Sequence, residues 1–276
     1  MGKFFAMSSA STAPIGIFDS GIGGLTVARA VKQELPGEHI IYFGDTAHLP
    51  YGDKSTAAIQ AYSIKITQML LNQGCKLILI ACNSASAAGY ELVSEYVGNS
   101  AKVLNVIDPV IDYLRENYQG KTVGLIGTKQ TVNSKVYEQK VQALNKNISL
   151  QALATPLLVP MIEEGFFTGD ISKKIIRKYL RDPWLQDMEA LILGCTHYPL
   201  IKKSILKYYG PMVEVIDSSV IVARALKGFL EFHNLINKHP GGKDHFMVSD
   251  FTDSFQASTR MFFGEKIKLE RSSLWD

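Results

Sequence analysis

The sequence carries one series of motifs twice, and this internal repetition restricts the folds available to the chain. The segment IGIFDSG at 15–21 has a counterpart in VGLIGTK at 123–129, and LILIACNS at 77–84 has one in LILGCTH at 191–197. Two further matches are IYFGDTAHLPYG (41–52) with ALATPLLVPMIEEG (152–165) and VLNVIDPVI (103–111) with VEVIDSSVI (213–221). Because the motifs follow the same order in both series, we infer two related halves rather than a chance likeness among strands.

Short apolar segments alternate with helical patterns along the chain. The predicted strands lie at 15–18, 39–43, 77–81, 103–107, 122–126, 149–154, 190–193, 213–216 and 245–248. The helical spacing of Ile59, Ile66 and Leu70 predicts a helix over 56–72. Near-continuous apolar strands alternating with helices are typical of parallel sheets covered on both faces. The sequence therefore predicts an α/β fold of two pseudo-symmetric domains, each a mostly parallel sheet flanked by helices, with the active site between them.

Charge and hydropathy exclude several functions. The net charge of +3 comes from 29 basic and 26 acidic residues that are interspersed, so we expect no nucleic-acid partner. The apolar segment 77–82 is far shorter than the ~20 residues that span a bilayer, and we expect no membrane partner. Residues 1–13 lack the apolar core of a secretory signal. We interpret them as a disordered extension and expect a cytoplasmic protein.

Two of the three cysteines stand where an apolar strand ends. Cys82 follows the strand in ACNSASAA and Cys195 follows the one in GCTHYPL, at the sheet edge where ligands of open α/β sheets gather. A thiol at a helix N-terminus is expected to have a lowered pKa, because the helix dipole favours the thiolate. Cys75 begins a strand and is interpreted as a small buried hydrophobe. Short polar residues that can cap a helix or bind a ligand stand beside the two thiols, at Asn83, Ser84 and Thr196.

The glycine-rich loop at 15–27 raises the alternative of nucleotide binding. Gly21 and Gly23 fit the pattern G-x-G-x-x-G, but Thr26 occupies its third glycine position. Asp19 ends the preceding strand, and its carboxylate would repel a pyrophosphate. We therefore favour a tight turn with close backbone approach, whose backbone N–H groups face a smaller anion.

Two matched thiols on facing halves suit the inversion of a carbon centre by proton transfer. This reaction needs a base on one face and an acid on the other, and a free thiol pKa of about 8.5 lets one be thiolate and the other thiol. Asp19 near one thiol and His197 near the other would bias these protons. One alternative is a metal site of Cys82, Cys195, His197 and Asp19. Others are a hydrolase or amidase with a Cys195 nucleophile and a His197 base, and a non-catalytic amino-acid-binding protein.

Five motifs together resemble those of the glutamate racemases, in the cofactor-independent aspartate/glutamate racemase superfamily. They are GIFDSGIGGLTV (16–27), GDTAHLPYGDKS (44–55), ACNSASA (81–87), VPMIEEG (159–165) and LGCTHYPL (193–200). The resemblance implies interconversion of L- and D-glutamate with no cofactor and no metal, supplying D-glutamate for peptidoglycan in a bacterial cytoplasm. Aspartate racemase remains the alternative within the superfamily.

The resemblance also implies roles for individual residues. Cys82 would remove the α-proton of the D-enantiomer and Cys195 that of the L-enantiomer, assisted by Asp19 and His197 respectively. The implied substrate-binding residues are Asp19, Ser20, Tyr51, Gly52, Asn83, Ser84, Thr196 and His197, with Asp45 and Glu163 as possible supporting residues. Ser84 stands where the family often has Thr, and it keeps the hydroxyl. His48 stands where Arg is frequent and receives no role.

The expected domain division also follows the family. Residues 14–106 and 213–276 would form the first domain and 107–212 the second, so that the last strands return to the first sheet. The expected partners are glutamate, as a small-molecule substrate, and a second copy of the chain in a homodimer. The segment from 239 to 264 reads as loop, strand and helix, and no chemistry is assigned to it.

Overall fold

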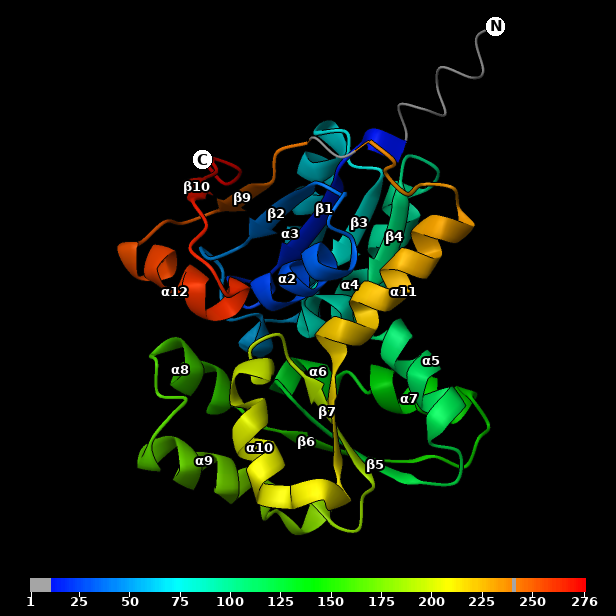
Figure 1. Cartoon of the computed structure of the whole chain (residues 1–276), viewed down its shortest axis with the longest axis vertical. Helices are drawn as coiled ribbons and strands as arrows, with labels where there is room; N and C mark the ends of the chain where they lie inside the picture. The colour runs from blue at the N-terminus through cyan, green and yellow to red at the C-terminus, as the bar shows by residue number, and fades with distance from the viewer. Residues whose placement is uncertain (1–10, 240–241) are drawn as a thin grey trace, which may run out of the picture.

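The chain forms two lobes, each built on a parallel sheet (Figure 1). The computed structural model describes residues 11–239 and 242–276. Within these residues the first sheet has the strand order β10-β9-β2-β1-β3-β4 and the second has the order β6-β5-β7-β8. The strands are β1 (Ile15–Asp19), β2 (Ile40–Gly44), β3 (Leu77–Ile80), β4 (Lys102–Asn105), β5 (Thr122–Gly127), β6 (Ser149–Ala154), β7 (Ala190–Gly194), β8 (Glu214–Asp217), β9 (His245–Val248) and β10 (Leu269–Arg271).

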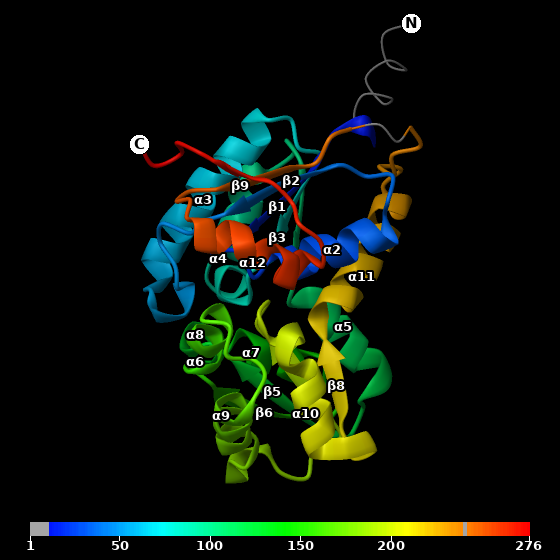
Figure 2. The same cartoon turned by 60° about the vertical axis from the view of Figure 1, so that its left-hand side comes forward.

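Helices cover both faces of the sheets, which confirms the predicted α/β class. In the first lobe α2, α11 and α12 lie together on one face and α3 and α4 on the other (Figure 2). The helices are α2 (Leu25–Glu34), α3 (Thr56–Asn72), α4 (Asn83–Val97), α5 (Asp108–Asn117), α6 (Lys129–Asn133), α7 (Val136–Ala143), α8 (Leu158–Glu163), α9 (Asp170–Leu180), α10 (Lys202–Tyr209), α11 (Ser218–Phe232) and α12 (Asp253–Phe263). Short 3₁₀ helices are η1 (Tyr51–Asp53), η2 (Pro183–Leu185), η3 (Tyr198–Ile201) and η4 (Gly210–Met212).

Alternate residues of each central strand belong to different parts of the core. Ile17 and Leu79 pack in the cluster that includes the buried residues of α2 and α11. Phe18 and Ile80, their chain neighbours, pack in the cluster under α3 and α4. Successive strand side chains point to opposite faces, so a strand buried on both faces must be apolar throughout. This requirement explains the continuous apolar runs in the sequence.

The two sheets share one strand order, which accounts for the repeated motifs. The order β2-β1-β3-β4 in the first lobe corresponds to β6-β5-β7-β8 in the second, and all of these pairs are parallel. The correspondence extends past the strands. The N–H of Asp45 donates to the carbonyl of Asp19 (3.0 Å), and the N–H of Thr155 donates to that of Gly127 (2.8 Å). The predicted pseudo-symmetry is therefore confirmed.

The predicted helix over 56–72 is confirmed as α3. It begins after Ser55, whose side chain accepts a hydrogen bond from the N–H of Ala58. Ile59, Ile66 and Leu70 are buried against the sheet. Gly74, just past the end of the helix, has φ +77°, a left-handed conformation that favours glycine. None of the helices within the described ranges is long and apolar enough to cross a membrane.

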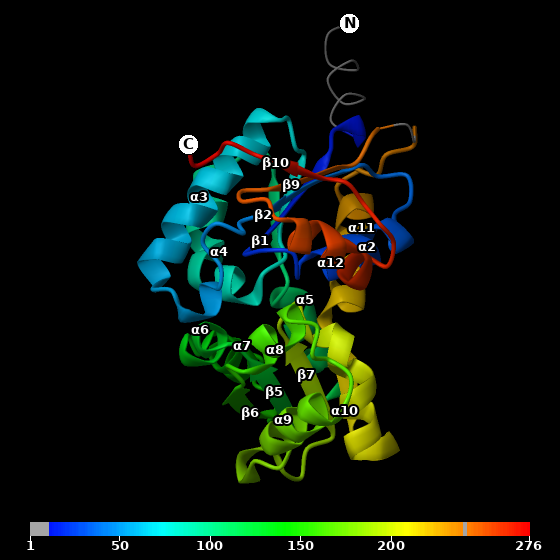
Figure 3. The same ribbon diagram turned by 90° about the vertical axis from the view of Figure 1, so that its left-hand side faces the viewer.

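The structure departs from the expected division of the chain at β8. This strand pairs with β7 in the second sheet, so residues 214–217 belong with the second lobe, past the expected return at 213. The chain re-enters the first lobe with α11, which packs on α2 (Figure 3). Strand β10 was not predicted at all. Of the expected extension 1–13, the first ten residues lie outside the described ranges, and the carbonyl of Ser11 accepts a hydrogen bond from Lys76 (2.6 Å).

Candidate active site

A cavity of about 220 Å³ lies between the lobes, where the carboxyl ends of strands from both sheets meet. The first lobe lines it with Ser20, Gly21, Leu49, Pro50, Tyr51, Gly52, Asp53, Cys82, Asn83 and Ser84. The second lobe lines it with Thr128, Lys129, Thr155, Pro156, Val159, Pro160, Glu163, Gly194, Cys195, Thr196 and His197. Pockets for drug-sized ligands begin at about 300 Å³, so this cavity suits a small molecule.

Most of the residues singled out in the sequence come together in this cavity. Those that line it are Ser20, Tyr51, Gly52, Cys82, Asn83, Ser84, Glu163, Cys195, Thr196 and His197. Asp19 and Asp45 are fully buried and do not line it. They lie behind the wall of the cavity, where their carboxylates hold the residues that form it.

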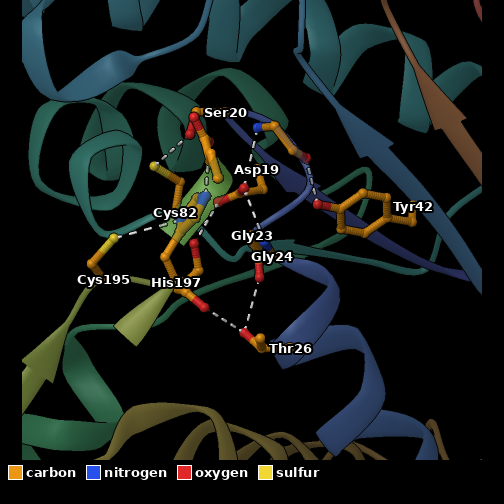
Figure 4. Close-up of polar contacts among 12 residues, drawn as sticks. Asp19, Ser20, Gly23, Gly24, Thr26, Tyr42, Cys82, Cys195 and His197 are labelled. Carbon is orange, nitrogen blue, oxygen red and sulfur yellow. Dashed lines mark hydrogen bonds and ion pairs between the residues drawn. The ribbon is translucent and has the colours of Figure 1, made fainter. Parts of the chain in front are cut away.

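Cys82 itself caps the helix that follows it. Its Sγ accepts a hydrogen bond from the N–H of Ala85 (3.4 Å) and lies 3.7 Å from the Oγ of Ser20 (Figure 4). Burial, followed by the nearby charge of Asp19, raises the pKa of the Cys82 thiol to about 12. The expected lowering of this pKa by the helix N-terminus is therefore wrong for Cys82. Desolvation and a like charge outweigh the helix dipole and keep the group a thiol.

Cys195 belongs to a chain of three polar side chains. Its Sγ lies 3.8 Å from Nδ1 of His197, and Nε2 of His197 lies 2.9 Å from Oε1 of Glu163. Burial opposes protonation of His197, but the hydrogen bonds to Cys195 and Glu163 prevail and raise its pKa to about 10. An imidazolium ring therefore faces Cys195. An α-helix was expected to start directly after Cys195. Instead the 3₁₀ turn η3 comes first, and α10 begins only after it.

Asp19 occupies the anion site of the glycine-rich loop. Its Oδ2 accepts hydrogen bonds from the N–H groups of Gly21 (3.1 Å) and Gly24 (2.9 Å). Burial raises the pKa of Asp19, while the charge of His197 and these N–H groups act in the opposite direction. The N–H groups of Ser20 to Gly23 were expected to face a ligand anion, and this expectation is corrected at Gly21. Its N–H, together with that of Gly24, already binds the carboxylate of the protein.

The glycines of this loop permit close packing within the loop and against the second lobe. A Cβ atom on Gly23 would lie 2.4 Å from the ring of His197, and one on Gly24 would lie 2.5 Å from the Cβ of Asp19. The Oγ1 of Thr26 donates to the carbonyl of Thr196 (2.9 Å), which joins the same two segments. The predicted close backbone approach is confirmed, and the space that a pyrophosphate would need is filled by the second lobe.

Two threonines of the cavity were missed in the sequence. By sheet register Thr128 corresponds to Ser20, and Thr155 corresponds to Asp45. The Oγ1 of Thr128 lies 2.8 Å from the Oγ of Ser84, across the boundary between the lobes. The repeat itself contained the signal, because VGLIGTK aligned on IGIFDSG already places Thr128 at the position of Ser20.

Within residues 11–239 and 242–276, no three His, Cys, Asp or Glu side chains are grouped to hold a metal ion.

The sequence profile of the Asp/Glu/hydantoin racemase family matches residues 24–226. The chain belongs to this racemase family. Among its relatives, the glutamate racemase of Chlorobaculum parvum is 38% identical over 258 residues, which cover 93% of this chain and 94% of that protein. The glutamate racemase of Syntrophus aciditrophicus is also 38% identical, over 255 residues that cover 92% of this chain and 94% of the relative.

Solved structures of racemases share this fold. The glutamate racemase of Francisella tularensis in complex with D-glutamate has a TM-score of 0.89 and 38% identity, covering 96% of this chain and 99% of its own. The aspartate racemase of Picrophilus torridus has a TM-score of 0.55 and 20% identity, covering 82% of this chain and 100% of its own. This second likeness shows the fold alone.

Proposed function

We propose that the protein is a glutamate racemase that moves a proton at the α-carbon between two cysteines. The observation that carries the proposal is that Cys82 and Cys195 follow equivalent strands, β3 and β7, and line one small cavity. The names of the relatives support glutamate as the substrate, since those at 38% identity over most of the chain are glutamate racemases.

The two thiols differ in their surroundings, and this difference distinguishes their roles. Cys195 faces the His197 imidazolium, whereas Cys82 lies near the Asp19 carboxylate and is buried as a thiol. With L-glutamate, the Cys195 thiolate takes the α-proton and leaves a planar carbanion. The Cys82 S–H then gives its proton to the opposite face, which yields D-glutamate. The reverse reaction starts from the state that this turnover leaves, with Cys82 as thiolate and Cys195 as thiol. The starting pair is restored when Cys195 gives its proton to water and Cys82 takes one from water, so atoms and charge balance over the whole cycle.

Glu163 and Asp19 act through other residues in this scheme. Glu163 keeps His197 protonated, and Asp19 fixes the loop that carries Ser20 beside Cys82. The substrate carboxylates would be bound by the short polar residues of the cavity wall, which are Ser20, Asn83, Ser84, Thr128 and Thr196. Enclosure by both lobes strengthens these hydrogen bonds, because water is excluded.

The cellular role follows from the product. D-glutamate would supply peptidoglycan in a bacterial cytoplasm, and the bacterial sources of the named relatives support this setting. The expected homodimer is inferred from the family resemblance alone.

We propose that the lobes are the two domains, with residues 14–106 and 218–276 in the first and 107–217 in the second, since β8 pairs with β7.

The experiment that tests the function follows optical activity. Purified protein, treated with a chelator and given no cofactor, is incubated with L-glutamate and the circular dichroism of the amino acid is recorded. The expected result is decay to zero ellipticity and, in deuterium oxide, exchange of the α-hydrogen with solvent in both enantiomers. Glutamate that binds without optical change would indicate a binding protein, and a covalent acyl-enzyme would indicate a hydrolase. Racemisation of aspartate faster than that of glutamate would show that aspartate is the substrate.

A further inference from the structure

The C-terminal part of the chain, to which the sequence assigned no chemistry, meets the candidate site at Asp45. This carboxylate is fully buried. Its Oδ2 accepts a hydrogen bond from the hydroxyl of Tyr51 (2.7 Å), and its Oδ1 accepts from Nε1 of Trp275 (2.8 Å) and Oγ of Ser249 (2.9 Å). Nδ1 of His48 lies 3.0 Å from both oxygens. Trp275 and Ser249 reach Asp45 from more than 200 residues away.

The indole ring of Trp275 is held in place by its neighbours. It meets the ring of His48 edge-on at 4.6 Å and that of Tyr62 at 5.6 Å, and Nζ of Lys65 lies 4.6 Å from its centroid. His48 in turn stacks on Tyr62 at 4.2 Å. These contacts fix the orientation of the ring, so that its N–H points at the Asp45 carboxylate. A hydrogen bond to a carboxylate is stronger than one between neutral groups.

Tyr51 connects this cluster to the cavity. It is the first residue of η1, which forms one wall of the cavity through Tyr51, Gly52 and Asp53. This wall contacts the second lobe. Gly52 lies so close to Thr128 that an added Cβ would be 2.8 Å from the Thr128 Cβ, and the carboxylate of Asp53 forms an ion pair with Lys129 (3.2 Å). A shift of Asp45 would therefore reach the substrate through the Tyr51 hydroxyl.

We propose that Trp275 is a positioning residue for the substrate cavity: its indole N–H fixes the Asp45 carboxylate, which holds Tyr51 and η1 against the second lobe. Trp275 does not line the cavity and acts only through Asp45. The proposal rests on the proposed function in one respect, since glutamate is the substrate whose binding is measured.

The sequence provides a matched pair of variants, because it contains two tryptophans. Trp275→Phe keeps an aromatic ring against His48 and removes the N–H, while Trp184→Phe changes an exposed ring in η2 that is absent from the cavity. We expect Trp275→Phe to raise the KM for glutamate about three- to tenfold, as for the loss of one typical hydrogen bond, with a smaller change in kcat. Trp184→Phe should leave both constants unchanged.

A double-mutant cycle identifies the route through Tyr51. If Trp275 acts through Asp45 and Tyr51, Trp275→Phe raises KM in the parent protein but adds nothing in a Tyr51→Phe background, since the link is already broken. Unchanged KM in Trp275→Phe, or full additivity in the cycle, would overturn the proposal. A fall in Tm with KM and kcat per folded molecule unchanged would also overturn it, because the role would then be structural only.

Hydrogen exchange separates this proposal from the proposed function. Peptides that cover residues 45–55 should exchange faster in Trp275→Phe than in Trp184→Phe, in the absence of any substrate. This arm needs no activity. If the parent protein fails to racemise glutamate but the exchange difference is found, the function is wrong and the positioning role stands. Equal exchange in the two variants would count against the positioning role whatever the activity.

Discussion

The Nε2 atom of His197 and the Oε1 atom of Glu163 lie 2.9 Å apart, so an acid of α8 holds the side of the imidazole ring that faces away from Cys195. The side chain of His197 is only 5% exposed. A buried ring paired in this way keeps its proton well above neutral pH, which is the condition that the proposed Cys195 thiolate requires.

Removal of the Glu163 charge should shift the pH dependence of the reaction. In Glu163→Gln the pKa of His197 falls below its present value of about 10, so the alkaline limb of kcat/KM for L-glutamate moves to lower pH. We expect a loss of about tenfold or more at pH 8, as for a hydrogen bond between charged groups. The matched control is Glu164→Gln, at the exposed neighbouring residue. Superimposable pH profiles for the two variants would contradict the assignment.

The same raised pKa predicts a dependence of stability on pH. Because the pKa of His197 rises from 6.5 in the unfolded chain to about 10, the folded state binds the proton more tightly. This stabilisation is complete below pH 6.5 and is lost as the pH rises through about 10. We therefore expect the difference in unfolding free energy between the parent and His197→Gln to shrink as the pH rises from about 6 to 10. Chemical unfolding of both proteins measures this difference. A constant difference would show that the ring titrates normally.

Each of the two cysteines proposed as catalytic should be essential, and the third cysteine should not be. Cys82→Ala and Cys195→Ala remove the acid or base on one face, and each should lower racemisation about 10²- to 10⁴-fold while the circular dichroism of the protein is unchanged. Cys75, buried outside the cavity, provides the control, since Cys75→Ala should keep turnover of the folded protein. Near-normal turnover in either of the first two variants would refute the two-cysteine mechanism.

A methyl group on Gly23 should displace His197. The added Cβ would lie 2.4 Å from the ring, and overpacking of this kind costs about 1–3 kcal/mol. We expect Gly23→Ala to lose stability by this amount, with activity lowered at least about tenfold because the imidazole leaves Cys195. Gly228→Ala is the control, because its Cβ would meet nothing within 4 Å on the exposed side of α11. That variant should gain about 0.5–1 kcal/mol.

The buried pair of Lys76 and Glu38 should matter for stability rather than for chemistry. Nζ of Lys76 lies 2.6 Å from Oε2 of Glu38, and both side chains are 2% exposed. Lys76→Met leaves a buried carboxylate without its partner and should cost about 3–5 kcal/mol in urea unfolding. The double variant with Glu38→Leu should recover part of this loss. The KM for glutamate should be unaffected in the folded protein, since neither residue lines the cavity.

The sheets could be predicted because they are buried on both faces. Each strand from β1 to β9 contains a run of apolar residues, and α3 could be predicted from the helical spacing of its apolar residues. Strand β10 has no such apolar run, because Leu269–Arg271 is a short edge strand with two charged residues. The return at 213 was misplaced for a related reason. The motif at 213–221 is half strand and half helix, and only pairing with β7 assigns the strand to the second sheet.

Site residues could be predicted where they stand in a repeated motif at a strand end. Cys82, Cys195 and His197 meet this condition. Trp275 and Ser249 do not, because their contact with Asp45 exists only after β9 joins β2 and the chain folds back beyond β10. The state of the Cys82 thiol also escaped prediction. A sequence shows the helix that follows a cysteine but not the desolvation and the neighbouring carboxylate that outweigh it.

The shared strand order of the two sheets has a consequence for handedness. No arrangement of L-amino acids can form the mirror image of itself, yet a catalyst of racemisation must treat two mirror-image molecules alike. Two lobes with the same strand order offer a way around this, since each places a thiol at the same small cavity. In the proposed mechanism these two like groups serve the two enantiomers, although neither lobe is the mirror image of the other.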